Sequence, residues 1–126
     1  MSSEGIDLGR KGEDLALDFL VKSGYKIISR NYKTKLGEID IIAKENNAIC
    51  FIEVKTRSSK RFGLGCESVS SRKQRQSAKA ALIFLKENNL LDKSARFDVV
   101  SIDASSNTPE INLIKNAFEL SGGFTY

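Results

Sequence analysis

The chain lacks histidine and tryptophan, and it holds only two cysteines and one proline among its 126 residues. Cys50 and Cys66 do not have a Cys-x-x-Cys spacing, so neither a structural zinc site nor a disulfide framework is indicated. The missing histidines exclude hydrolases that pair a serine or cysteine nucleophile with a histidine base. Any hydrolysis by this chain must therefore use carboxylates, lysine and a metal ion.

The chain also lacks an apolar run of about eighteen residues, a basic-then-apolar leader and a lipidation signal. We therefore expect a soluble, unexported protein of the cytoplasm with no membrane partner. Its 126 residues, 40% of them hydrophobic, fit a single domain over residues 1–126 with one core. Residues 1–7 are small and polar, and we expect them to fray.

Positive charge is concentrated in one stretch of the chain. The formal net charge is only +4, from 20 basic and 16 acidic residues. Residues 54–79 nevertheless hold eight basic residues and one acidic residue, a net charge of +7, which leaves −3 for the rest of the chain. Such asymmetry favours a face that binds a polyanion such as nucleic acid, although a basic, solvated helix end gives the same pattern.

A β-hairpin is predicted in the middle of the chain. Two β-rich runs, residues 39–43 and 48–56, flank Asn46 and Asn47. Asparagine tolerates the positive φ that a tight hairpin turn demands, which makes these two the central turn residues. The second run is almost entirely apolar from residue 48 to residue 52, as is typical of a central strand buried on both faces.

The register of this hairpin brings acidic residues together. Asp40 faces Glu53 and Glu38 faces Lys55, and all four side chains project from one face of the sheet. Facing carboxylates repel, so this pair attracts a hard divalent cation such as Mg²⁺ or Mn²⁺. Lys55, further along the same face, can then reach a phosphate or an attacking water. The alternative is a set of solvated ion pairs, in which Glu53 pairs with Lys55 or Arg57.

The same residues resemble a known signature. Asp40 followed by Glu53-Val54-Lys55 resembles the Asp…Glu-x-Lys motif of the restriction-endonuclease-like, PD-(D/E)XK nuclease superfamily. Three blocks, residues 37–43, 51–57 and 96–100, resemble the YraN-like family of small bacterial proteins, which is related to archaeal Holliday junction resolvases. The resemblance extends over residues 9–118. It implies a restriction-endonuclease-like α/β core, with a mixed central β-sheet flanked by helices, and a metal-dependent endonuclease acting on branched or single-stranded DNA.

A first helix over residues 8–23 supplies one more acidic candidate. Glu13 borders the apolar stripe of this helix, whereas its acidic neighbours face outward. Residues 9–13 resemble the first-helix motif of resolvase-like nucleases, in which a glutamate adds to the metal site. The resemblance thus assigns Glu13, Asp40 and Glu53 as metal ligands and, together with Lys55, as the catalytic residues. A glutamate stabilised by the helix dipole is the alternative for Glu13, and Gly9 and Gly12 indicate close approach of another backbone.

The basic stretch leads into a second helix. Ser70 or Ser71 is its expected N-cap and residues 88–90 its end, and its first turns are basic. Further strands are expected at residues 25–32, 97–102 and 111–114. Because a long helix connects the strand at residues 48–56 to the strand at residues 97–102, these two strands are predicted to be parallel. We assign backbone contacts with nucleic acid to five residues: Arg57, Lys60, Arg61, Lys73 and Arg75.

Other functions remain open on the sequence alone. A noncatalytic nucleic-acid-binding adaptor that keeps the nuclease fold is the principal rival, and a purely structural interaction protein is a third. Candidate partners are DNA and DNA repair, recombination or uptake proteins. A resolvase-like cut of two strands would require a homodimer, but no segment of the sequence indicates a dimer interface.

Overall fold

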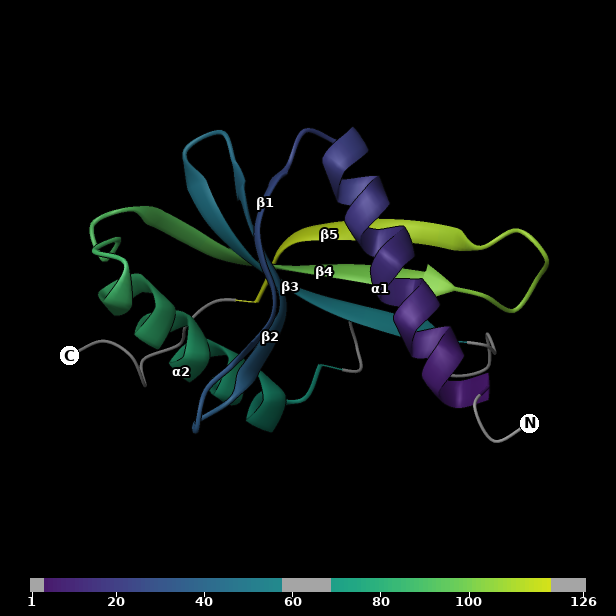
Figure 1. The fold of residues 1–126 in the computed structure, drawn as a ribbon, viewed down its shortest axis with the longest axis horizontal. Coiled ribbons are helices and arrows are strands. Elements are labelled where there is room, and N and C mark those ends of the chain that lie inside the picture. The colour runs from purple at the N-terminus through teal and green to yellow at the C-terminus, as the bar shows by residue number, and fades with distance from the viewer. Residues whose placement is uncertain (1–3, 58–68, 119–126) are drawn as a thin grey trace.

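A computed structural model describes residues 4–57 and 69–118 of the chain, with side chains in the first helix described from residue 11 onward. Figure 1 shows the order of the elements in this part of the chain: α1 (Glu4–Lys22), β1 (Lys26–Lys33), β2 (Glu38–Glu45), β3 (Ala48–Arg57), α2 (Ser71–Glu87), β4 (Ser94–Asp103) and β5 (Glu110–Phe118). The expected helices and strands are present, and most are longer than their apolar patterns, because those patterns mark only the buried part of each element. In the described part of the chain, no helix has the length and apolar character needed to cross a membrane.

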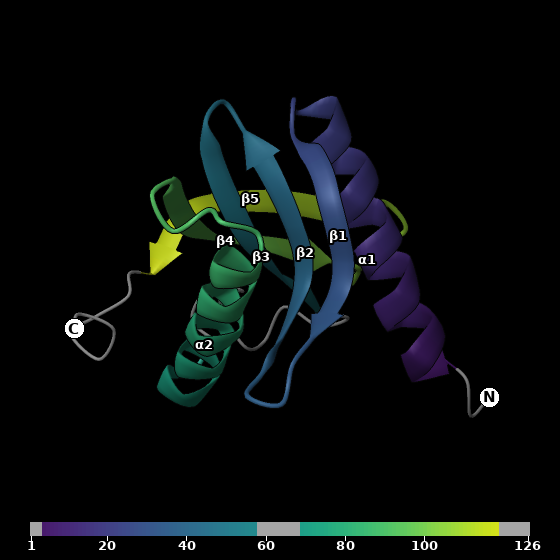
Figure 2. The same ribbon diagram turned by 60° about the vertical axis from the view of Figure 1, so that its left-hand side comes forward.

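The five strands form one mixed sheet in the order β1-β2-β3-β4-β5. β3 and β4 are parallel from the pair Ala48 and Ser94 to the pair Arg57 and Asp103, and the other neighbouring strands are antiparallel. α2 connects the parallel strands, as the strand–helix–strand order predicts. Figure 2 shows the sheet between α1 and α2. The expected α/β fold with flanking helices is therefore confirmed, and its finer assignment to the restriction-endonuclease-like core stays a prediction.

Each face of the sheet carries its own hydrophobic core, because side chains alternate along a strand. On the α1 face, helix residues Ala16 and Leu20 pack with residues that include Ile41, Cys50, Ile52 and Val100. On the α2 face, Phe84 lies with Phe51 and Phe97, and the Phe51 ring centroid is 6.0 Å from that of Phe84 and 5.6 Å from that of Phe97. β3 contributes to both cores. Glu53, near the end of β3, therefore lies beside apolar side chains.

α1 approaches β3 closely at a glycine. A Cβ atom at Gly12 would stand 2.1 Å from the Oγ1 atom of Thr56. Gly12 thus has the close neighbour that was expected, but the neighbour is a side chain and not the backbone that the sequence predicted. α1 ends where Gly24 adopts a φ of 99°, a conformation that glycine tolerates better than other residues. The packing brings Gly12, and with it Glu13, to the carboxyl end of β3.

A buried polar network lies at the opposite end of the sheet. Asp98 is fully buried, and its carboxylate accepts hydrogen bonds from Arg96 Nε, from Tyr25 Oη and from the backbone N–H of Asn116, at 3.0, 3.0 and 2.9 Å. Arg96 Nη2 also donates to Glu45 Oε1 at 2.5 Å. Tyr25 is 3% exposed, as expected of a core aromatic residue. With its partners in place, this network stabilises the start of β4 rather than offering open coordination.

Candidate functional site

Asp40 and Glu53 come together at the end of the β2–β3 ladder. The paired residues run from Glu45 and Ala48 to Ile41 and Ile52, which confirms the register predicted from the asparagine turn. Asn46 has a φ of 56°, as that turn requires. Beyond the last pair, Asp40 Oδ2 accepts a hydrogen bond from the backbone N–H of Val54 at 2.8 Å. The Asp40 carboxylate therefore lies against the backbone of β3 directly after Glu53.

A local break in side-chain alternation accompanies Asp40. Ile39 packs in the core on the α2 face, whereas Ile41, two residues along, packs in the core on the α1 face. In a regular strand these two side chains would share one face. On the neighbouring strand, Asn31 has a φ of 52° at the position between the partners of Ile41 and Ile39. Such irregularities often re-aim a side chain near a functional site, and here the residue affected is Asp40.

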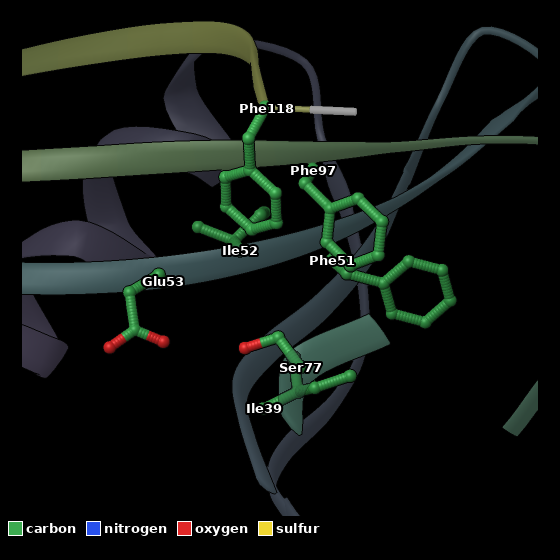
Figure 3. Close-up of a pocket in the computed structure, with 7 residues that line it drawn as sticks. All are labelled: Ile39, Phe51, Ile52, Glu53, Ser77, Phe97 and Phe118. Carbon is green, nitrogen blue, oxygen red and sulfur yellow. The ribbon is translucent and has the colours of Figure 1, made fainter. Parts of the chain in front are cut away.

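Glu53 is a buried acid. It is 8% exposed, and it lines an internal pocket that offers no space to a water molecule. Figure 3 shows its carboxylate on one side of this pocket, with the Ser77 hydroxyl turned toward that side and the aromatic rings on the other. Burial, and then the negative charge of Asp40, raise the pKa of Glu53 from its usual 4.5 to about 7. Burial also raises the pKa of Asp40, against the hydrogen bond from Val54.

Two lysines flank the Glu53 carboxylate. Lys55 Nζ lies 3.7 Å and Lys73 Nζ 3.8 Å from Glu53 Oε2. Both distances are too long for strong hydrogen bonds, so the lysines lower the pKa of Glu53 but do not offset the effect of burial. Lys55 lies beside Glu53, as the strand spacing predicts. Sequence reasoning assigned Lys73 only to nucleic-acid binding and missed its place at the carboxylate pair.

The position of Lys73 follows from the start of α2. Ser70 is the N-cap, and its side chain accepts the backbone N–H of Lys73, which confirms one of the two predicted caps. α2 has no acidic residue in its first turn, as expected. A long helix that must return the chain to the start of a parallel strand begins near the carboxyl end of the preceding one. That rule was the available signal for placing the first turn of α2 beside Glu53.

Glu13 lies near the pair but has a partner of its own. Its Oε1 atom is 3.7 Å from Arg30 Nη2, which also binds Asp14 at 3.0 Å. The charge of Glu13 contributes to the raised pKa of Asp40. Within residues 11–57 and 69–118, however, no three acidic, cysteine or histidine side chains are grouped closely enough to hold a metal ion. The set of Glu13, Asp40 and Glu53 is thus not assembled as a three-ligand group, and its metal role stays a prediction.

The chemistry of the two-carboxylate pair nevertheless fits a hard cation. Mg²⁺ commonly takes one or two carboxylates and completes its shell with water and phosphate oxygens. Asp40 and Glu53 both have a raised pKa, chiefly through burial, and the negative charge of Asp40 further raises the pKa of Glu53. A divalent ion between them would remove that repulsion. The donor set therefore fits Mg²⁺ or Mn²⁺ with two protein ligands.

Of the remaining predicted nucleic-acid contacts, the structure describes Arg57 and Arg75. Arg75 is exposed on α2, and Arg57 is the last residue of β3. Lys60 and Arg61 lie outside the described residues. Lys73 approaches the carboxylate pair, with its Nζ atom 3.8 Å from Glu53 Oε2, and provides positive charge there from α2.

Comparison with known proteins identifies the family. Residues 12–102 match the profile of "Uncharacterised protein family UPF0102". The chain belongs to the UPF0102 family. A UPF0102 protein of Geobacter metallireducens is 49% identical over 120 residues, which cover 95% of this chain and 98% of the relative. A UPF0102 protein of Caldicellulosiruptor bescii is 53% identical over 114 residues, which cover 88% of this chain and 96% of the relative. A UPF0102 protein of Clostridium kluyveri is 43% identical over 122 residues, which cover 95% of this chain and 100% of the relative. UPF0102 membership confirms the YraN-like resemblance, and the wider nuclease superfamily stays a prediction.

Proposed function

We propose that this UPF0102 protein is a divalent-metal-dependent endonuclease that hydrolyses phosphodiester bonds in DNA on a restriction-endonuclease-like core. The supporting observation is the Asp40–Glu53 pair, two neighbouring carboxylates with raised pKa values beside two lysines. A neutral residue at position 53 would avoid the cost of burying a charge in dry surroundings. Carboxylates held at such a cost are typical of catalytic and metal-binding sites.

Each side chain of the candidate site has a separate role in the proposed hydrolysis. Asp40 and Glu53 would hold Mg²⁺ or Mn²⁺, and Glu13 is the candidate for a further ligand. When bound, the ion supplies Lewis-acid polarisation of the phosphate and lowers the pKa of an attacking water. Lys55, 3.7 Å from Glu53, orients that water and offsets the charge that develops on the phosphate. Lys73, 3.8 Å from Glu53, neutralises the backbone of the bound strand.

DNA is the proposed partner, and the basic residues supply its affinity. Contacts between lysine or arginine and phosphate release counterions, so binding should weaken steeply as the salt concentration rises. A homodimer, and association with DNA repair, recombination or uptake proteins, stay predictions. The residues proposed for backbone contact are Arg57, Lys60, Arg61, Lys73 and Arg75.

Metal-dependent nicking of branched DNA tests the proposal. Wild type should nick in Mg²⁺ or Mn²⁺, and Glu53→Gln and Lys55→Met should each lose about 100-fold or more in rate while still retaining DNA. Lys44→Met removes an exposed lysine from the far end of β2 and is the matched control, expected to nick normally. DNA binding by all four proteins with no nicking by wild type would overturn the nuclease and favour the adaptor. Failure of wild type to bind DNA at all would favour the structural interaction protein.

A further inference from the structure

A polar groove lies where the β1–β2 turn meets α2. Its volume is about 310 Å³, and it is lined by residues 34–38 of the turn together with Lys73 and Gln76 of α2. Lys35 and Lys73 provide positive charge on its two walls. A hollow of this size lies within the range of small-ligand sites.

Two residues that line the polar groove also interact with the carboxylate pair. Lys73 lines the groove, and its Nζ atom is also 3.8 Å from Glu53 Oε2. Glu38 lines the groove too, and its negative charge acts on Asp40. A phosphate held in the groove would therefore lie next to the groups proposed to hold the metal.

A second, largely apolar hollow extends the groove along the same turn. It has a volume of about 530 Å³ and shares residues 34–36 with the polar groove. Its other lining residues include Tyr32, Ile83 and Glu87. Leu36 belongs to both hollows and is 53% exposed, so it offers an apolar surface to a ligand in either of them.

The β1–β2 turn, whose residues 34–36 line both hollows, is held in place by its own hydrogen bonds. Thr34 Oγ1 accepts the backbone N–H groups of Leu36 and Gly37, both at 3.1 Å, and donates to the carbonyl oxygen of Gly37 at 2.9 Å. The turn is also seated on α2, because a Cβ atom at Gly37 would stand 2.3 Å from the carbonyl oxygen of Gln76. The groove can therefore receive a ligand without first ordering this turn.

We infer that the polar groove and the apolar hollow, together called the double groove, bind a single strand of nucleic acid. A phosphate would lie beside Lys35 and Lys73, and a base would lie against Leu36. This inference rests on the proposed function. A duplex keeps the faces of its bases stacked inside and would leave the apolar hollow empty, whereas an unpaired base offers an apolar face. Glu87, which accepts a hydrogen bond from Tyr32 Oη at 2.8 Å, repels phosphate at that end and suits the amino group of a base. Single-stranded DNA, or the unpaired arm of a branched molecule, is thus the preferred substrate class.

Fluorescence anisotropy in EDTA, with one oligonucleotide as a single strand and as a duplex, tests the inference without cleavage. Wild type should bind the single strand at least about tenfold more tightly than the duplex. Leu36→Ser should weaken single-strand binding about five- to tenfold and leave duplex binding unchanged. Val21→Ser is the control for the loss of an exposed apolar side chain, because Val21 is 54% exposed and belongs to α1, on the other face of the sheet.

A second variant tests the phosphate position. Lys35→Gln should reduce the slope of log affinity against log salt for the single strand by about 0.7, one phosphate contact, and Lys26→Gln, at the far end of β1, should not. Equal affinity for single strand and duplex, with both groove variants at wild-type affinity, would overturn this inference and leave the proposed nuclease standing. Wild type that neither binds nor nicks any DNA would overturn both.

Discussion

Replacing Glu53 by glutamine should make the protein more stable at high pH. The pKa of Glu53 is about 7 in the folded protein, against 4.5 as its ordinary value, so folding favours the protonated form. Between these values the folded state holds a proton that the unfolded state has released, so stability falls as the pH rises. Glutamine has the shape of a protonated glutamate and cannot ionise. The variant should therefore escape this loss.

The size of the effect follows from the shift in pKa. One pKa unit corresponds to 1.36 kcal/mol, so a rise from 4.5 to about 7 corresponds to a loss of about 3 kcal/mol once the pH exceeds 7. Urea unfolding of wild type and Glu53→Gln at a series of pH values measures it. Taking the difference between the two proteins at each pH removes most other titrating groups. The difference should be near zero below pH 4.5 and reach about 3 kcal/mol in favour of the variant at pH 8.

Glu110→Gln removes a glutamate at an exposed position on β5, and it should not reproduce the pH-dependent gain. Mg²⁺ or Mn²⁺ at pH 8 should stabilise wild type, by relieving the repulsion with Asp40, more than it stabilises Glu53→Gln. If the variant matches wild type at pH 8, or is less stable than wild type there, Glu53 carries no destabilising charge and the reasoning for a metal site fails.

Two further substitutions probe what holds the site in position. Gly12→Ala should destabilise the protein by about 1–3 kcal/mol in thermal or urea unfolding, because its Cβ would lie 2.1 Å from Thr56 Oγ1. The same change in a Thr56→Ala background should cost less, and an equal cost in both backgrounds would contradict the contact. Asp98→Asn should cost about 3 kcal/mol, because it removes a fully buried charge that faces Arg96. A near-wild-type unfolding midpoint for Asp98→Asn would show that the network around Asp98 is not a stabilising one.

Much of the fold was predictable from local signals. The asparagine turn at Asn46 and Asn47 set the hairpin register, since strand pairing follows from turn length. Ser70 marked the start of α2 because its side chain caps a backbone donor. The extents of the elements were less predictable. β5 runs from Glu110 to Phe118 as one strand, whereas its sequence reads as two short apolar pieces, because polar residues on an edge strand face solvent and interrupt the pattern.

The candidate site was predictable only in part. Strand alternation predicted that Asp40, Glu53 and Lys55 approach one another, since these residues lie on paired strands. It could not predict the break in alternation at Asp40, which depends on the packing of Ile39 against α2. The approach of Lys73 and the double groove depend on contacts between segments distant in sequence. Such tertiary contacts leave no periodic signal in the chain.

Two acidic residues on the β2–β3 strand pair, Glu45 and Glu53, point to different roles because their surroundings differ. Glu45 accepts hydrogen bonds from Lys115 and Arg96, and these two cations lower its pKa. Glu53 lies on the same strand pair but at the other end, and burial together with Asp40 raises its pKa in spite of two nearby lysines. A carboxylate with enough donors stabilises the fold wherever it is ionised, whereas a buried carboxylate with too little positive charge around it gains that stabilisation when a cation binds. The end of β3 that carries Glu53 is therefore where this fold would gain most from binding a metal ion.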